Sequence, residues 1–391
     1  MRRQPTAAEL RLLEQLDESE VVELLRDLIQ CRSDNPPGQE LACAEAIQRY
    51  LSANGISGRL VEALPGRPNA IAYVEFGSGP TLALNGHMDT VPPGSGWTTD
   101  PFGGALQGDL VFGRGAMDMK GGLAAACVTV AVLKRSGLPL HGRLALHAVI
   151  DEEVGGTGSK QSSLEDADWV IIAEPTNGQV FSHGNGQLNW EVVVSGTAAH
   201  MAAPEEGRNA IHDAAALTAL LEAHNRELAK APFPGIGPAT YAVAVIAGGL
   251  SGSTVPNQCT MTIDRHVSPS ETLDQAEDEF QGLLDQLAAR RPGFQSKFVR
   301  TLEFPPLSGS NSAPLAETIR NVVRDLGGPE TDNNGMRFAT DAAWYAARRR
   351  SVVVFGPGDG STSHEPDERI RVDDLLFGAK ALVLTAVRLL G

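Results

Sequence analysis

Imidazole and carboxylate side chains follow four strand-like apolar runs of this chain, each at the point where the run ends. Open α/β sheets form their sites just beyond the carboxyl ends of their strands. Imidazoles and carboxylates gathered at such an edge are ligands for a divalent metal of the zinc type. The groups at the four strand ends are His87, Asp151-Glu152-Glu153, Glu174 and His364. The sequence therefore predicts metal-dependent chemistry.

The first run leads into Gly86-His87-Met88-Asp89. In a His-x-Asp arrangement the imidazole can bind a metal ion while the aspartate orients it. The motif is weak alone, because a lone histidine is more often structural. A second candidate is Asp118, in a glycine-studded loop just before an apolar helix. Its two oxygens could bind one cation each, although an acidic turn residue or a helix N-terminal carboxylate is the alternative.

Asp151-Glu152-Glu153 is the sharpest local signal. Three acids at the end of a buried strand repel one another unless a positive charge lies among them. Adjacent side chains on a strand point to opposite faces, so Glu153 can bind a metal ion while Glu152 serves as a general base. The alternative is a solvated turn, because two glycines follow. Together with Glu174 and His364, the pattern supplies one histidine and one acid for each of two ions.

Bulk properties exclude several classes of protein. The chain has 391 residues, 42% hydrophobic and 20% charged, which allows two domains with ordinary cores. The net charge of −16 argues against nucleic-acid or anionic-membrane partners. No apolar run approaches the roughly 20 residues of a membrane span, and no secretory signal is visible. Four cysteines without CxxC spacing indicate free thiols in a reducing cytoplasm.

Periodicity predicts the elements that position these residues. Strands and helices alternate to about Phe181, which is typical of an α/β fold with a doubly wound, mostly parallel sheet. Residues 69–76 and 81–85 are expected to be neighbouring strands. Two helices among antiparallel strands then predict a small α+β insert, and the α/β pattern resumes past Pro292. The predicted domains are a discontinuous catalytic domain of residues 1–183 and 293–391, and an insert of residues 184–292.

The ordered motifs resemble the dinuclear zinc amidohydrolase and peptidase family of acetylornithine deacetylase, succinyl-diaminopimelate desuccinylase, aminoacylase and carboxypeptidase G. The resemblance runs from about Val21 to the C-terminus. It implies two divalent ions, zinc in the first place, with cobalt or manganese as alternatives. The implied ligands are His87 and Glu174 for one ion, Glu153 and His364 for the other, and Asp118 as the bridge.

The same resemblance implies roles for residues around the ions. Glu152 matches the general base, and Asp89 matches the acid that orients the histidine. The peptide bond between Asp118 and Met119 is expected to be cis.

In the resembled family the insert is a lid that also forms a homodimer. His200 matches a histidine that reaches into the partner subunit's site and stabilises the oxyanion. Asn209, in the same motif, and Thr340, before a late helix, match substrate contacts. The family's Asp-x-Arg, whose arginine grips the substrate carboxylate, is replaced here by Asp264-Arg265-His266. Either Arg265 serves after a small register change, or His266 stands in and the substrate is held differently.

The function implied is a metal-dependent amidohydrolase that removes the acyl group from an N-acyl amino acid. A dipeptidase or carboxypeptidase of the same family is the alternative. A catalytically inactive metal-binding protein is a third possibility, but a merely structural metal site needs no free base such as Glu152. A dinuclear phosphoesterase is disfavoured because an acid-rich site repels phosphate.

Overall fold

The computed structural model describes residues 4–162, 167–309, 311–330, 335–348 and 350–391, which divide into two compact units. The first unit comprises Met1–Ser182, Gly309–Asn333 and Thr340–Gly391, and the second comprises His183–Ser308 and Asn334–Ala339. Each unit has its own hydrophobic core.

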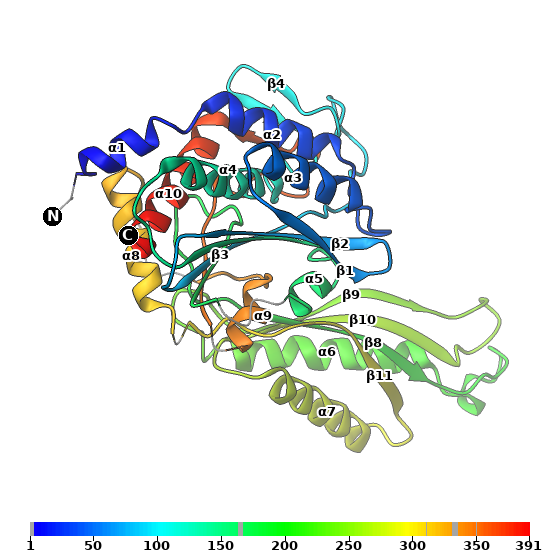
Figure 1. The fold of residues 1–391 in the computed structure, drawn as a ribbon. Helices are drawn as coiled ribbons and strands as arrows, with labels where there is room; N and C mark the ends of the chain where they lie inside the picture. Colours follow the sequence, from blue (N-terminus) through cyan, green and yellow to red (C-terminus); the bar gives the residue numbers. More distant parts are fainter. Residues whose placement is uncertain (1–3, 163–166, 310, 331–334, 349) are drawn as a thin grey trace. The chain divides into compact units, whose positions relative to one another are not determined.

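The centre of the first unit is a sheet in the order β1-β2-β6-β3-β7-β12 (Figure 1). Strands β6, β3, β7 and β12 run parallel, while β2 pairs antiparallel with β1 and β6. The mostly parallel sheet is as predicted, but β2 and β3 are not neighbours, because β6 lies between them. The strands are β1 (Gly58–Leu64), β2 (Arg67–Glu75), β3 (Thr81–His87), β6 (Arg143–Val149), β7 (Trp169–Ile172) and β12 (Ser351–Val354).

Helices cover both faces of this sheet. Helices α2, α3, α4 and α10 lie on one face, and α5 and α9 lie on the other (Figure 1). The helices of the unit are α1 (Ala7–Leu13), α2 (Glu18–Gln30), α3 (Leu41–Ala53), α4 (Lys120–Ser136), α5 (Thr157–Lys160), α8 (Ala313–Asp325), α9 (Ala342–Ala347) and α10 (Val372–Leu390). None of the helices that the structure describes has the length and apolar character to cross a membrane.

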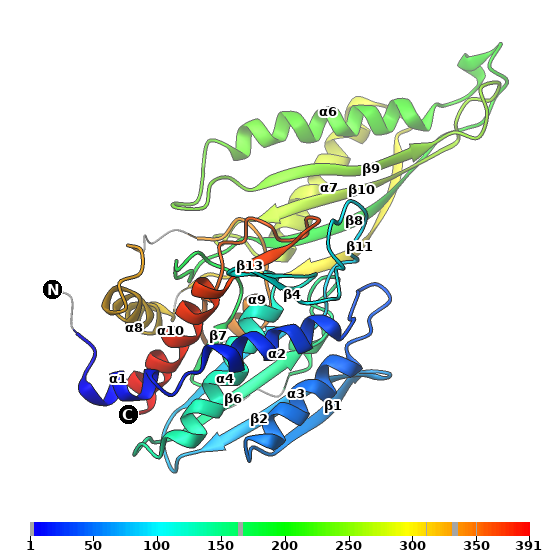
Figure 2. The ribbon, with the colours of Figure 1, turned by 90° about the horizontal axis from the view of Figure 1, so that it is seen from above.

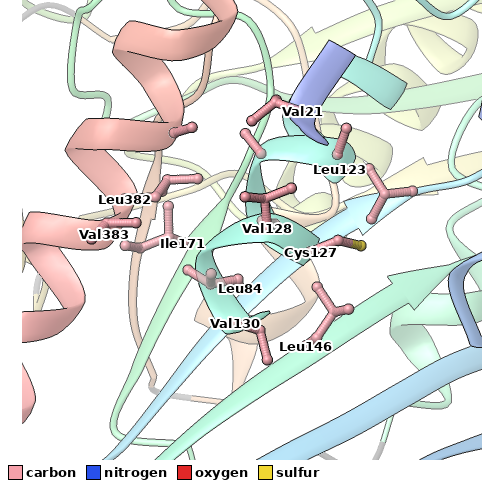
Figure 3. Close-up of a cluster of buried hydrophobic side chains, with 14 of the residues drawn as sticks. Val21, Leu84, Leu123, Cys127, Val128, Val130, Leu146, Ile171, Leu382 and Val383 are labelled. Atoms are coloured by element: carbon pink, nitrogen blue, oxygen red, sulfur yellow. The ribbon is translucent and has the colours of Figure 1, made fainter. Parts of the chain in front are cut away.

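Helix α4 is the central helix of the first core. Figure 3 shows its side chains Leu123, Cys127 and Val128 packed among Leu84 of the sheet and Leu382 of α10. A helix that is apolar on all sides belongs inside a protein, where its whole surface can be buried. Helix α4 follows directly on the loop of Asp118, so it gives that loop a rigid support.

A small sheet in the order β13-β5-β4, with β13 and β4 labelled in Figure 2, also belongs to the first unit and was not predicted from the sequence. Its strands are β4 (Ala105–Gln107), β5 (Leu110–Phe112) and β13 (Arg369–Arg371). The pairing of β13 with β5 brings the segment after His364 beside the segment before Asp118.

The second unit is an antiparallel sheet in the order β11-β8-β10-β9 with helices α6 and α7 packed on one face. Trp190 stacks on Phe280 in its core at a centroid distance of 4.5 Å. Strand β11 pairs with β8 along most of its length, so this unit extends beyond the expected boundary at residue 292. The elements are β8 (Gly186–Ser195), α6 (Ala210–Leu228), β9 (Thr240–Gly248), β10 (Gln258–Val267), α7 (Leu273–Arg290) and β11 (Gln295–Phe304).

Candidate active site

The parallel strands β6, β3, β7 and β12 are consecutive in the sheet, so their carboxyl ends meet at one edge. His87 is the last residue of β3, Glu153 follows β6, Glu174 follows β7, and the loop of His364 follows β12. Asp118 comes from the loop before α4. The sheet therefore brings together side chains that are up to 277 positions apart in the chain (364 − 87).

These five side chains form two groups that share Asp118. His87 Nε2 lies 3.4 Å from Asp118 Oδ1 and 3.6 Å from Glu174 Oε1. His364 Nε2 lies 3.5 Å from Asp118 Oδ2 and 3.3 Å from Glu153 Oε2. Each oxygen of Asp118 thus faces a different imidazole. Among the described residues these are the groups with the donor types and proximity to hold a metal ion.

Asp89 contacts the His87 ring through its main-chain oxygen. His87 Nδ1 lies 2.8 Å from the main-chain oxygen of Asp89 but 3.7 Å from its carboxylate. Because a carbonyl only accepts hydrogen bonds, Nδ1 carries a proton, and in the neutral imidazole Nε2 therefore has the free lone pair that a metal ion needs. The Asp89 carboxylate instead accepts the main-chain N–H groups of Glu152 and Glu153, at 3.1 and 3.2 Å. Asp89 therefore positions both an imidazole and the acidic turn.

The acids after β6 lie in a turn, so strand alternation does not explain their directions. The strand ends at Val149, and Asp151 has a φ of +70°. The Asp151 carboxylate is bound by Arg67 at 3.1 Å and by the hydroxyl of Thr157. Asp151 is thus outside the two ligand groups. Glu152 is outside them too, although its Oε2 lies 3.9 Å from His87 Nε2.

Sequence reasoning missed Asn35, which joins two parts of this edge. Its side-chain amide donates to Asp89 Oδ2 at 2.9 Å and to Asp151 Oδ1 at 3.0 Å. Arg67 supplies the positive charge beside Asp151, and it also binds Glu40 at 2.8 Å through Nε. An amide followed by two prolines gave no chemical signal of this role. The Asp118–Met119 peptide bond is cis, as the resemblance implies.

Burial and neighbouring charges raise the proton affinity of the three glutamates at this edge, Glu152, Glu153 and Glu174. Burial raises the pKa of Glu152 well above its usual range, helped by the charges of Glu174 and Asp341. Burial and the charge of Asp118 do the same to Glu174. Burial by itself lowers the pKa of His87, but Glu174 and neighbouring acids outweigh it and raise that pKa. Such a concentration of buried negative charge is the environment that a divalent cation relieves.

Thr340 and Asp341 lie at the start of α9, in the first unit. The Thr340 hydroxyl accepts the N–H of Ala342 at 3.3 Å, so this side chain serves the helix terminus. Asp341 is 1% exposed, and burial raises its pKa to about 7. The charge of Asp341 acts on Glu152, the predicted base, and this effect was not predicted from the sequence.

Four of the expected site residues belong to the second unit, namely His200, Asn209, Arg265 and His266. His200 is exposed in the loop after β8, and its Nδ1 accepts the N–H of Ala202 at 3.0 Å. Asn209 caps α6, with its side-chain oxygen 2.9 Å from the N–H of Ile211. That contact is structural and occupies the acceptor of the amide.

Arg265 and His266 point to opposite faces of β10. The Arg265 side chain is fully buried, contacts the carboxylates of Glu271 and Glu279 at 3.1 Å, and lies over the Tyr241 ring. His266 is 34% exposed on the other face. Arg265 is therefore committed to the core of the second unit, and the register change considered above has no support. His266 is the one of the two that a ligand can reach.

Comparison with known proteins identifies the family. The profile of Peptidase family M20/M25/M40 matches residues 83–388. The chain belongs to this family. A probable succinyl-diaminopimelate desuccinylase of Staphylococcus aureus (strain N315) is 28% identical, over 91% of this chain and 94% of the relative. A deformylase of Bacillus subtilis (strain 168), named for N-formyl-4-amino-5-aminomethyl-2-methylpyrimidine, is 27% identical over 93% of each chain.

A solved structure of a dinuclear metal-binding peptidase of the M20 family from Bacillus subtilis matches with a TM-score of 0.69. It is 16% identical, over 95% of this chain and 98% of that chain, so this likeness concerns the fold. The expectations of an M20-type fold and of a metallohydrolase acting on amide bonds are confirmed at the level of the family. The relatives differ in the acyl group that their names specify.

Proposed function

We propose that two divalent ions, zinc in the first place, bind at the strand-end edge and that the chain hydrolyses the amide bond of an N-acyl amino acid. The observation that carries the proposal is Asp118, whose two oxygens each face one imidazole at 3.4 and 3.5 Å. The donor set of imidazole and carboxylate suits zinc, cobalt and manganese. His87, Asp118 and Glu174 would hold one ion, and Asp118, Glu153 and His364 the other.

Glu152 is proposed as the general base. When bound, the two ions would lower the pKa of a water molecule towards neutrality and polarise the substrate carbonyl. Glu152 lies at the same edge, outside both ligand groups, and its raised pKa suits a group that takes up a proton and later releases it. It would take the proton of that water and deliver it to the leaving amine.

Family membership does not specify the acyl group or the amine of the substrate, so both are part of the proposal. Names such as desuccinylase and deformylase among relatives support removal of a small acyl group. A dipeptidase or carboxypeptidase is the second candidate, supported by the solved peptidase of similar fold. Thr340, Asn209 and His266 are the proposed substrate contacts. Because Arg265 is buried and His266 is 34% exposed, a substrate carboxylate would meet His266.

The second unit is proposed to act as a lid and to form a homodimer, with His200 contributed to the partner subunit's site. Strand β9 is an edge of its sheet and carries exposed apolar residues, with Val245 at 55% and Ile246 at 49%, and Leu250 at 95% follows it. An exposed apolar edge strand can pair with a second copy of itself. A cytoplasmic location is proposed from the free state of the cysteines.

A substrate panel on the full chain tests this function. N-acetyl, N-succinyl, N-formyl and N-carbamoyl amino acids and dipeptides are assayed with zinc or cobalt added and with a chelator. Turnover of acyl amino acids that the chelator abolishes supports the proposal, and preference for dipeptides favours the peptidase. Silence across the panel in the metal-loaded protein would favour an inactive metal-binding protein.

A further inference from the structure

A buried ion pair joins the loops of Asp118 and His364. Arg114 is 2% exposed and Glu368 is fully buried, and Arg114 Nη1 lies 2.5 Å from Glu368 Oε2. The two residues are 254 positions apart in the chain. Burying two charges costs several kcal/mol unless good geometry and further hydrogen bonds compensate. The further hydrogen bonds of Arg114 and Glu368 therefore show which parts of the chain the pair holds in place.

The second oxygen of Glu368 is bound to the main chain of the Asp118 loop. Glu368 Oε1 accepts the N–H groups of Met117 at 2.9 Å and of Asp118 at 3.0 Å. The main-chain oxygen of Glu368 accepts the N–H of Gly113 at 2.9 Å, where β13 meets β5. One buried carboxylate thus fixes the main chain from which the Asp118 side chain projects.

The guanidinium of Arg114 reaches the His364 loop. Its Nη2 donates to the carbonyl oxygens of Pro93 at 3.2 Å and of His364 at 3.4 Å, and the group lies 5.2 Å from the centre of the Trp97 ring. His364 has a φ of +65°, which is uncommon for a residue other than glycine. Its side chain is 50% exposed, so contacts to the main chain matter for its position.

We propose that Arg114 and Glu368 are positioning residues that hold Asp118 and His364 at the spacing needed for the second ion. The inference rests on the two-ion centre proposed above. Neither residue is among the proposed ligands, and both act through main-chain contacts. His87 and Glu174 stand at the ends of β3 and β7, where the sheet supports them. Weakening the pair therefore lowers affinity for the second ion more than for the first.

Two variants weaken different halves of the pair. Glu368→Gln keeps the shape of the side chain but removes its charge and one of the acceptors. Arg114→Lys keeps the charge but loses the planar fork that reaches a carboxylate and two carbonyls. The control is Arg371→Gln, which breaks the exposed pair between Arg371 and Asp109 (2.8 Å) beside the same two strands. Both side chains of that pair are 54% exposed, so its loss has little effect.

Calorimetric titration of the metal-free full chain with zinc chloride measures both ions. The expected result is two ions for the parent and the control, with binding of the second about 10-fold to 100-fold weaker in Glu368→Gln and Arg114→Lys. The cobalt absorption spectrum gives an independent readout, because the band that grows with the second equivalent should shift or disappear. Unchanged affinity for the second ion, or equal weakening of both ions, would overturn the proposal.

Two further outcomes are distinguishable. If Glu368→Gln does not fold, Arg114→Lys decides the question, since it leaves the bonds from Glu368 to the Asp118 loop in place. If the parent protein binds fewer than two ions, the two-ion centre itself is contradicted, and the positioning role falls with it.

Discussion

Asp89 illustrates how a single residue links several parts of the site. Its carbonyl fixes the orientation of the His87 ring, and its carboxylate holds the N–H groups of Glu152 and Glu153. Asn35 then connects the same carboxylate to Asp151. The base and the ligands of both proposed ions therefore depend on a few buried hydrogen bonds.

Replacing Glu152 with glutamine tests the assignment of the base. The amide keeps the shape of the side chain but cannot take up a proton, so kcat should fall by about 10²-fold to 10⁴-fold. Zinc stoichiometry should stay at the parent value, because Glu152 lies outside both ligand groups. Initial rates and calorimetric titration on the same preparation measure the two effects. A variant with parental kcat would remove Glu152 from the mechanism.

Replacing Asn35 with alanine tests the hydrogen-bond link. Asp89 Oδ2 and Asp151 Oδ1 each lose a donor in a buried place, which should cost about 1–3 kcal/mol of unfolding free energy. The rate constant kcat should also fall, because the turn of Glu152 loses support. The matched control is Asn321→Ala on α8, whose amide makes an exposed contact of 3.3 Å to Glu317. Equal urea-denaturation midpoints for the two variants would contradict the role of Asn35.

The proposed ligands could be selected from the sequence, but the residues that support them could not. Imidazoles and carboxylates that follow strand-like runs can be recognised in the sequence, because an open α/β sheet brings the carboxyl ends of its strands together. Asn35, Arg114 and Glu368 have ordinary local surroundings, and only the folded chain brings them to Asp89, His364 and Asp118. The same holds for Arg265, whose burial against the Tyr241 ring cannot be predicted from its position in a strand.

At the scale of elements, the sequence predicted what is local and missed what is not. The strands expected at 69–76 and 81–85 are observed as β2 (Arg67–Glu75) and β3 (Thr81–His87), so their ends differ by no more than two residues. Strands β1 and β11 were not predicted from the sequence. The place of β6 between β2 and β3 depends on pairing between distant segments. Strand β11 alternates like any strand, so only its pairing with β8 assigns it to the second unit.

Gly122 tests how closely α4 must approach the sheet. A Cβ at Gly122 would lie 1.8 Å from the carbonyl oxygen of Ala173, the residue before Glu174. Gly122→Ala should therefore cost about 1–3 kcal/mol in unfolding free energy and weaken zinc binding. Gly282→Ala in α7 is the matched control, because nothing lies within 4 Å of its added Cβ. Gly282→Ala should stabilise the protein by about 0.4–1 kcal/mol. Thermal denaturation should therefore show a lower Tm for Gly122→Ala and a higher Tm for Gly282→Ala.

At the scale of the whole molecule, the two hydrophobic cores share no residue among those described. Domains with separate cores can unfold as separate cooperative units. All five proposed ligands belong to the first unit. Zinc should therefore stabilise the first unit, by about 2.7 kcal/mol at a free concentration 100 times the dissociation constant. The unfolding temperature of the second unit should stay unchanged. Scanning calorimetry with zinc and with a chelator measures both transitions.

The effect of zinc on the first unit should grow with pH. The pKa values of Glu152, Glu153 and Glu174 are raised by burial and by neighbouring acids, and that of His87 is raised by the acids around it. Groups with a raised folded pKa take up protons on folding, so their stabilisation is present at low pH and is lost as pH rises through that pKa. The pKa of Asp118 is lowered from 3.8 despite its burial, because His87 and His364 outweigh that burial, so its contribution stays constant near neutral pH.

The metal-free first unit should therefore lose stability, with a falling Tm, as pH rises from the ordinary pKa values of these groups through their raised values in the folded protein. Zinc competes with protons for the same side chains, so the metal-loaded protein should lose less Tm, or none, over this range. The difference in Tm between zinc-loaded and chelated protein then widens as pH rises. A difference that stayed constant would mean that zinc binds elsewhere, because only binding at the titrating imidazoles and carboxylates couples the two effects.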